Sequence, residues 1–176
     1  MKLIVALGNP GKNYARTRHN VGWLFLDWLF PKAKWQASAK AKAEYLKTEI
    51  NGQRAEIIKP QTFMNNSGIA VAYAANKNGV KLNDIIVIHD DKDISLGATR
   101  VQQNRGAGGH NGVASIIEKL GSKNFTRIRI GIAPTDNRII EDTANFVLSK
   151  LTATEQKTLK TVFANIKQEL EAWVLL

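Results

Sequence analysis

His19 is the side chain in this sequence with the clearest capacity for acid–base chemistry. It is one of three histidines, and it lies within residues 17–23, where a loop gives way to a predicted helix. The positive end of a helix disfavours an imidazolium, so we expect a neutral ring that can accept a proton. The same position would also suit a histidine that only hydrogen-bonds to backbone at a helix start.

Asp90 is the predicted partner of His19. It follows a continuous apolar run at residues 84–88, which predicts a buried strand ending in the polar turn His89-Asp90-Asp91. The ligand clefts of open α/β sheets lie beyond the carboxyl ends of strands, so we expect Asp90 to point into such a cleft. A carboxylate on the second ring nitrogen of His19 would fix the tautomer and stabilise the protonated ring.

No convincing nucleophile accompanies this pair. The chain has no cysteine, which also excludes disulfides and thiolate metal sites. Ser67 is the hydroxyl that a candidate turn offers, and its position favours capping of the following helix. The simplest chemistry is therefore a general base that activates water, which contributes about 10²–10⁴-fold in rate.

Asparagines stand in the remaining polar turns, at Asn9, Asn65 and Asn111. An amide side chain offers a donor and an acceptor without charge, which suits recognition of a peptide bond. A single donor to a developing oxyanion can contribute about 10²–10³-fold. Asparagine is also common in turns and helix caps, so a purely structural role stays open for each of the three.

The glycine-rich residues 106–112 open a predicted helix and could form a backbone nest for an anion. They match neither the Walker loop nor the dinucleotide fingerprint, and the glycines could equally permit close packing. Arg127 and Arg129 share one face of a predicted strand. Together with Arg100 and Arg105 they could form a phosphate-binding strip.

A metal site is the competing reading of the histidines and aspartates. Candidate ligands are His19, His89, His110, Asp90, Asp91 and Asp93. No HExxH-type spacing occurs, and Lys92 stands among the carboxylates of residues 90–93. We therefore expect no metal and no other cofactor.

Strand and helix patterns alternate along the chain and predict the elements that position these side chains. Predicted strands cover residues 2–7, 42–50, 53–59, 84–88, 99–103 and 127–132, with Asn51-Gly52 as a two-residue hairpin turn. Predicted helices begin after Asn20, after residues 61–68, at about residue 113, at about residue 139 and at the capping box Thr152–Glu155. Without a repeat or linker, residues 1–176 predict one domain, an α/β/α sandwich with a mixed, mostly buried central sheet.

The charge balance points to a polyanionic partner. Twenty-five Lys and Arg against fifteen Asp and Glu give a net charge of +10, although a generally basic surface would give the same sum. No run approaches the roughly 18 apolar residues of a membrane span, and the apolar start is too short for a signal peptide. We therefore expect a soluble cytosolic protein.

Four motifs together resemble those of bacterial peptidyl-tRNA hydrolases, in order and in spacing over most of the chain. They are Gly8-Asn9-Pro10-Gly11 with Tyr14 and Thr17-Arg18-His19-Asn20, then residues 59–65 (KPQTFMN), then His89-Asp90, then Gly108-Gly109-His110-Asn111-Gly112. The resemblance implies an esterase that cleaves peptide from tRNA, acting as a monomer without metal, on an α/β/α fold.

The resemblance also implies roles for individual residues. His19 corresponds to the family's catalytic base and Asp90 to its supporting carboxylate, while Asn9 belongs to the peptide and water site. The expected substrate-binding residues are Tyr14, Met64, Asn65, His110 and Asn111.

The tRNA terminal phosphate is expected to meet basic residues, of which Arg129 matches one. Gln102 stands where the family would have a lysine, and Arg100 is expected to substitute for it. Two other classes of function stay open: a non-catalytic RNA-binding module that uses the basic face, and a phosphate-ester enzyme that uses the glycine-rich nest.

Overall fold

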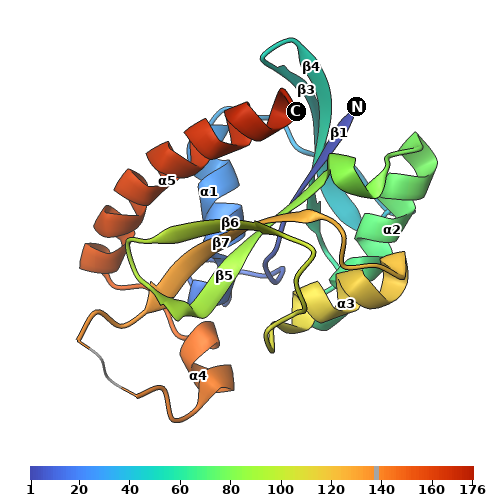
Figure 1. The fold of residues 1–176 in the computed structure, drawn as a ribbon. Helices are drawn as coiled ribbons and strands as arrows, with labels where there is room; N and C mark the ends of the chain where they lie inside the picture. The colour runs from blue at the N-terminus through green and yellow to red at the C-terminus, as the bar shows by residue number, and fades with distance from the viewer. Residues whose placement is uncertain (137–138) are drawn as a thin grey trace.

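The computed structural model describes residues 1–136 and 139–176 and contains one mixed sheet of seven strands, within those residues (Figure 1). The strand order is β2-β3-β4-β1-β5-β7-β6. Strands β4, β1, β5 and β7 run parallel, while β2, β3 and β6 pair antiparallel with their neighbours. Their bounds are β1 (Lys2–Ala6), β2 (Gln36–Ser38), β3 (Ala43–Ile50), β4 (Gln53–Pro60), β5 (Ile85–Ser95), β6 (Thr99–Gln103) and β7 (Thr126–Ala133).

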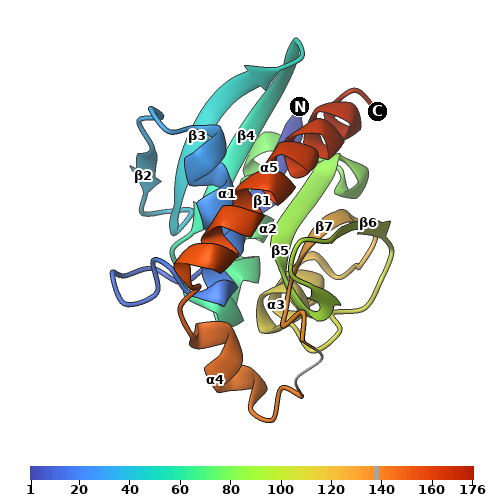
Figure 2. The same ribbon diagram turned by 90° about the vertical axis from the view of Figure 1, so that its left-hand side faces the viewer.

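Helices cover both faces of this sheet. Helices α1 and α5 lie on one face, as Figure 2 shows, and α2 and α3 lie on the other. The helices are α1 (Val21–Leu29), α2 (Ser67–Asn78), α3 (Asn111–Leu120), α4 (Thr143–Leu148) and α5 (Ala153–Val174), with 3-10 turns η1 (Arg18–Asn20), η2 (Met64–Asn66) and η3 (Leu82–Asp84). The predicted α/β/α arrangement around a mixed sheet is confirmed.

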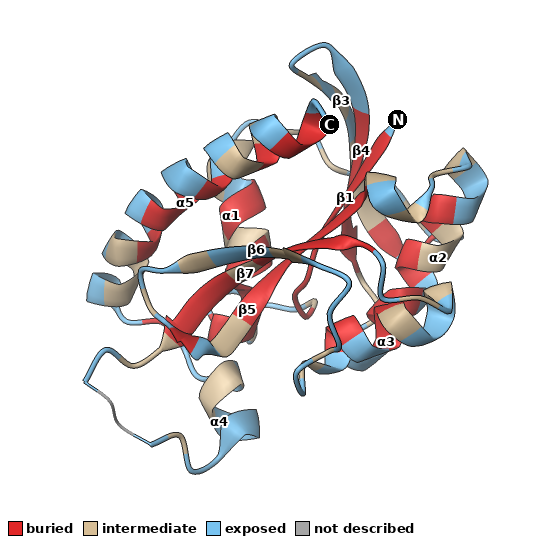
Figure 3. Cartoon of the chain, viewed as in Figure 1, coloured by how far each residue is buried: buried red, intermediate tan, exposed pale blue. Residues whose placement is uncertain are grey.

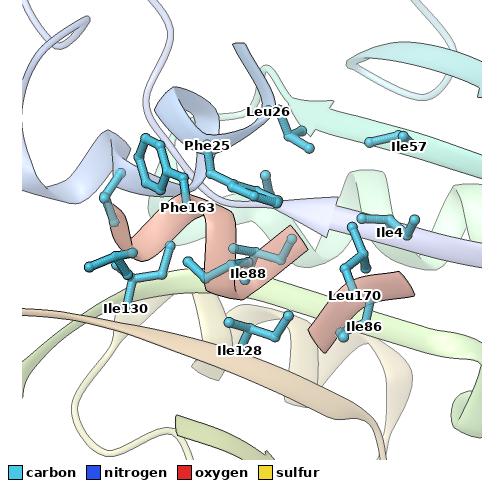
Figure 4. Packing of buried hydrophobic residues seen from close by; sticks show 14 of the residues in the cluster. Ile4, Phe25, Leu26, Ile57, Ile86, Ile88, Ile128, Ile130, Phe163 and Leu170 are labelled. Carbon is cyan, nitrogen blue, oxygen red and sulfur yellow. The ribbon is translucent and has the colours of Figure 1, made fainter. Parts of the chain in front are cut away.

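Alternation along the central strands divides the core into two clusters. Ile4 and Ala6 face α1 and α5, whereas Leu3 and Val5 face α2 and α3, because successive strand side chains point to opposite faces. Figure 4 shows the first cluster, in which Phe163 of α5 packs against the strand isoleucines. Figure 3 shows that the central strands β1, β5 and β7 are buried along most of their length. Burial on both faces explains why these strands are continuous apolar runs in sequence.

Two local predictions are confirmed in detail. Asn51 and Gly52 have φ values of 50° and 77°, the left-handed pair that a two-residue hairpin requires between β3 and β4. The capping box at the start of α5 is formed by Thr152 and Glu155, each accepting a backbone N–H from the other. Local chemistry alone determines both features, which is why the sequence was sufficient to predict them.

The predicted turn at residues 89–91 is wrong. Strand β5 continues through them to Ser95, and His89, Asp90 and Asp91 pair in parallel register with Arg129, Ile130 and Gly131 of β7. The polar residues stay in the strand because the neighbouring strand satisfies their backbone groups. Asp90 therefore projects from a rigid strand, and not from a turn.

The helix predicted over residues 139–148 is shorter than expected. Helix α4 begins at Thr143, after Asp142, whose Oδ1 accepts the backbone N–H of Asn145 at 3.0 Å. Ile139 is 86% exposed and contributes no apolar face to a helix. The sequence also suggests that residues 137–148 could cover a cleft; residues 137 and 138 of that segment lie outside the described residues.

Membrane insertion through a helix finds no support in the described residues, because none of their helices is both long and apolar enough to cross a bilayer.

Candidate active site

The candidate site lies beyond the carboxyl end of β1 and beside the middle of β5, where η1 packs against the sheet. Gly22, the second residue of α1, makes this approach possible. A Cβ at this position would lie 2.7 Å from the carbonyl oxygen of Ile88 and 2.9 Å from that of Leu7. No larger residue fits between α1 and these carbonyl groups, so this glycine allows His19 of η1 to reach Asp90 in β5.

His19, Asp90 and His110 form one buried hydrogen-bonded cluster, here called the Asp90 network. Asp90 Oδ1 lies 2.8 Å from Nδ1 of His19 and 2.9 Å from Nε2 of His110. The Asp90 side chain is 2% exposed, and the two imidazole side chains are 10% and 8% exposed. The centres of these two rings are 4.9 Å apart. The two histidines that share this carboxylate oxygen lie 71 and 20 positions from Asp90 in the chain.

The hydrogen-bond partners assign the ring protons of all three histidines. An ionised carboxylate only accepts, so His19 carries a hydrogen on Nδ1 and His110 on Nε2. His110 Nδ1 accepts the backbone N–H of Val113 at 3.3 Å, so that nitrogen is unprotonated. His89 Nδ1 donates to the carbonyl oxygen of Asp90 at 2.7 Å, and its buried Nε2 has no hydrogen-bond partner in the described part of the chain.

His19 is therefore the histidine with a usable lone pair. Its Nε2 has no hydrogen-bond partner among the described residues, and the ring lines the cleft. His110 uses its lone pair to cap α3, and the lone pair of His89 is enclosed by protein.

The pKa values of two groups here are displaced by the cluster. Burial raises the pKa of the Asp90 carboxyl, but His110 and then His19 lower it by more, so it lies well below its usual range. Burial lowers the pKa of His89, and the neighbouring His110 lowers it further. Asp90 is thus held as an anion and His89 as a neutral ring.

Asn9 is oriented by two neighbours. Its Oδ1 accepts the backbone N–H of Met64 at 2.8 Å. Asn20 does not cap α1 with its side chain as predicted; its Oδ1 accepts the N–H of Asn9, and its Nδ2 donates to the carbonyl oxygen of Asn9, each at 2.9 Å. Since Oδ1 of Asn9 is engaged, its Nδ2 is the end available to a ligand. It has no partner among the described residues.

The predicted cap at Ser67 is also wrong. Ser67 is the first residue of α2, and its hydroxyl donates to the carbonyl oxygen of Met64 at 2.9 Å. It is fully buried, which rules out contact with a ligand.

The cleft has two lobes that meet at His19. The first lobe is about 220 Å³ and the second about 290 Å³, and both are lined by His19, Asn111, Ala144 and Val147. The first is also lined by Asp90, Asp91, Lys92, Gly108, Gly109, His110 and Thr143. The second is also lined by Asn9, Tyr14, Phe63, Met64, Asn65 and Leu148. The cleft therefore brings together all the predicted catalytic and substrate-binding residues.

Several lining residues were not assigned from sequence. Phe63 was quoted only as part of a motif, yet it is 53% exposed at the cleft with a φ of 56° and meets the Tyr14 ring edge-on at 6.2 Å. A positive φ at a phenylalanine cannot be read from sequence. Lys92 and the α4 residues Ala144 and Val147 gave no signal beyond helical spacing or charge.

Three of the four arginines predicted to form a strip, Arg100, Arg127 and Arg129, lie on the adjacent strands β6 and β7 and are here called the arginine strip; Arg105 lies in the loop after β6. Arg100 and Arg129 are directly opposite in antiparallel register, and Arg100 is exposed. Arg129 is already partnered, because its Nε donates to Asp91 Oδ2 and its Nη1 to Gln102 Oε1, each at 2.6 Å. Arg127 is buried, and its Nη2 donates to the carbonyl oxygen of Gly106 at 3.0 Å.

The glycine-rich turn positions His110. Gly108 and Gly109 have φ values of 61° and 81°, and the chain then enters α3 with His110 as its N-cap. Because the His110 ring accepts the N–H of Val113, that amide is not free for an anion. The turn serves the Asp90 network directly.

Metal coordination remains a chemical option for the same three side chains. One ligand atom from each of His19, Asp90 and His110 lies within 4.8 Å of the others. A cation between them would have to displace both of the protons that now bridge the imidazoles to the carboxylate. In the hydrogen-bonded arrangement, both ring N–H groups already donate to the buried carboxylate.

Comparison with known proteins shows similarity along nearly the whole chain. The family model described as peptidyl-tRNA hydrolase matches residues 3–175. A peptidyl-tRNA hydrolase of Oceanobacillus iheyensis is 37% identical over 176 residues, covering 99% of this chain and 92% of the relative. One of Mycobacterium avium is 44% identical over 162 residues, covering 91% and 84%. The crystal structure of peptidyl-tRNA hydrolase from Acinetobacter baumannii superimposes with a TM-score of 0.90 at 31% identity, covering 99% of this chain and 89% of that one.

Proposed function

Because the chain belongs to the peptidyl-tRNA hydrolase family, we propose that it hydrolyses the ester bond between a peptide and the terminal ribose of tRNA, with His19 as general base. The observation that supports this assignment most directly is the unengaged Nε2 of His19 in the cleft, while Asp90 accepts the hydrogen on Nδ1.

In the proposed step, His19 Nε2 removes a proton from a water molecule as the water oxygen attacks the ester carbonyl carbon. The imidazolium that forms is stabilised by Asp90, which stays ionised because its pKa is held low. His19 then returns the proton to the departing ribose oxygen. An ester has a good leaving group, so no protein nucleophile is needed.

Asn9 is the proposed donor to the carbonyl oxygen of the ester. Its Oδ1 is held by Met64, which directs Nδ2 toward the second lobe, where Asn9 forms part of the lining. A donor fixed before the reaction stabilises the oxyanion without reorganisation, which can contribute about 10²–10³-fold. Asn65 and Asn111 line the same lobe and are proposed to pair with the amides of the peptide.

The two lobes are proposed to receive the two parts of the substrate. The second lobe, with Tyr14, Phe63 and Met64, offers apolar surface and amides to a peptide. The first lobe is lined by Asp91, which binds Arg129, so it adjoins the arginine strip and suits the anionic tRNA end. All these groups belong to one chain and need no cofactor, so we propose a monomer that acts on peptidyl-tRNA in the cytoplasm.

The test uses N-acetyl-aminoacyl-tRNA and unblocked aminoacyl-tRNA as paired substrates. We expect release of the blocked amino acid and much slower release of the free one, since a free ammonium would have to be desolvated beside the ester. An RNA-binding module would bind tRNA in a salt-sensitive way without releasing either amino acid. Excess chelator should leave the rate unchanged; a loss restored by zinc would instead support a metal at the Asp90 network.

A further inference from the structure

Helix α4 lines the cleft, and its apolar contact with the core comes from the partly buried Phe146 and Val147. It contributes Ala144 and Val147 to both lobes, yet none of its residues is buried. Figures 1 and 2 show it at the end of the molecule, apart from the other helices. A groove of about 520 Å³ runs along its other side. A helix of six residues in this position needs anchoring other than burial.

Arg18 provides polar anchors at the carboxyl end of α4. Its Nη1 donates to Ser149 Oγ and to the carbonyl oxygen of Lys150, each at 2.8 Å. Its guanidinium also lies over the Phe146 ring, with the carbon 4.8 Å from the ring centre. Within the described residues, η1 is the element that α4 contacts most closely, and Arg18 is the first residue of η1.

The same guanidinium reaches the start of α5. Its Nη2 donates to Glu155 Oε1 at 2.5 Å, while Oε2 of Glu155 completes the capping box with the N–H of Thr152. Burial alone would raise the pKa of Glu155, but the Thr152 backbone bond and the charge of Arg18 lower it, so the pair is ionic. The Arg18 side chain is only 10% exposed, which limits its ability to contact tRNA directly.

The main chain reinforces this junction. The N–H of Arg18 donates to the carbonyl oxygen of Ser149 at 3.1 Å, and the N–H of Leu151 donates to the carbonyl oxygen of Arg16 at 2.9 Å. Since His19 is the next residue in η1, any shift of Arg18 moves both α4 and the ring that binds Asp90.

We propose that Arg18 is a positioning residue for ester hydrolysis, which sets the place of α4 over the cleft relative to the His19 ring. The expected effect on kcat rests on the proposed function, whereas the expected effect on the anchoring of α4 does not. Arg18 does not touch the substrate; it acts through Phe146 and Ser149 on one side and through His19 on the other.

The central test compares Arg18→Ala with Arg16→Ala. Arg16 is exposed, and its side chain makes no hydrogen bond with a described residue, so the two variants lose the same charge toward tRNA. We expect kcat to fall about 10–100-fold in Arg18→Ala relative to Arg16→Ala, because small misplacements of reacting groups are costly. Addition of methylguanidinium should restore part of kcat in Arg18→Ala and none in Arg16→Ala. A merely structural arginine would lower the thermal midpoint while the folded fraction kept its kcat, and that result would overturn the proposal.

A second measurement is independent of the substrate. Hydrogen exchange of the amides of Phe146 and Ser149 should be faster in Arg18→Ala than in Arg16→Ala, with exchange in α2 unchanged. Equal exchange in the two variants would overturn the proposal even if the enzyme cleaves peptidyl-tRNA. Faster exchange in a protein that cleaves no peptidyl-tRNA would refute the proposed function while leaving the anchor itself established.

Two milder variants keep the test decisive if Arg18→Ala does not fold. Arg18→Lys keeps the charge but cannot make the three donor contacts in their fixed geometry. Glu155→Gln keeps the capping box and removes only the ionic partner. Both are expected to speed exchange in α4 and to lower kcat several-fold; wild-type values in both would overturn the proposal.

Discussion

The Asp90 network, centred on Asp90 of β5, lies beside the arginine strip of β6 and β7, but the side chains of the network are all buried, whereas the strip includes the exposed Arg100. In the network, every ring nitrogen of His19 and His110 is either bonded to a described residue or, at His19 Nε2, open to the cleft. In the strip, Arg129 is bound by Asp91 and Gln102, while Arg100 across from it is exposed.

This difference follows from what each region must do. Proton transfer needs one lone pair at a fixed place in a medium of low dielectric constant, which a buried and fully bonded cluster provides. Attraction of a polyanion acts over about 8–10 Å in salt and tolerates mobile charges. Substitutions in the network should therefore change kcat, and substitutions in the strip should change KM.

The largest effect is expected for His19→Ala. Without the lone pair in the cleft, kcat should fall about 10²–10⁴-fold while the fold is retained. His110→Ala serves as the matched variant, because it removes a second ring from the same carboxylate but not the proposed base. Single-turnover assays with N-acetyl-aminoacyl-tRNA measure both, and a larger loss in His110→Ala would transfer the role of base to that residue.

Asp90→Asn should lower kcat by about 10²-fold. An amide can turn its NH₂ toward His19 Nδ1, which would move the ring hydrogen to Nε2 and remove the lone pair from the cleft. KM should change little, since Asp90 is 2% exposed. A variant with normal kcat would show that Asp90 only supports the fold.

Arg100→Glu should raise KM about 10-fold at low salt and reduce the salt dependence of KM, with kcat and the thermal midpoint unchanged. Arg129→Gln should raise KM and also lower the thermal midpoint, because it leaves Asp91 without its ion-pair partner. If Arg100→Glu behaves as wild type in a titration of KM against salt, the strip does not meet the tRNA.

The smallest effect concerns stability and the third histidine. The pKa of His89 is lowered in the folded state, so the unfolded chain binds a proton first as pH falls below about 6.5. Its contribution to stability is complete above that pH and declines below it, by at most about 1.4 kcal/mol per pH unit. Asp90, His110 and Arg127 are the charged or titratable groups around it.

His89→Asn isolates this contribution. An asparagine amide can keep the hydrogen bond to the carbonyl oxygen of Asp90 but does not titrate. Urea unfolding between pH 5 and 7.5 should show a flatter pH dependence in His89→Asn than in wild type. Parallel curves would mean that other groups control the acid sensitivity.

The sequence predicted features that depend on neighbouring residues better than features that depend on contacts between residues distant in the chain. The hairpin at Asn51-Gly52 and the capping box of α5 depend on residues a few positions apart, and both are confirmed. The end of β5 is set by its pairing with β7. The side chain of Asn20 is set by its hydrogen bonds with the backbone of Asn9. Both predictions failed, because their partners are distant in sequence.

The amino-acid sequence by itself determined most of the strands and helices, although not β2, and it placed polar residues beside the apolar strands, because periodicity and turn chemistry act within a few residues. Only the tertiary structure decided which of three histidines keeps an open lone pair. That choice depends on the N–H of Val113, the carbonyl oxygen of Asp90 and the glycine contact that brings η1 to β5. Hydrogen bonds form only at donor–acceptor distances of about 3 Å, so the type of a residue does not determine which partner it will have in the folded protein.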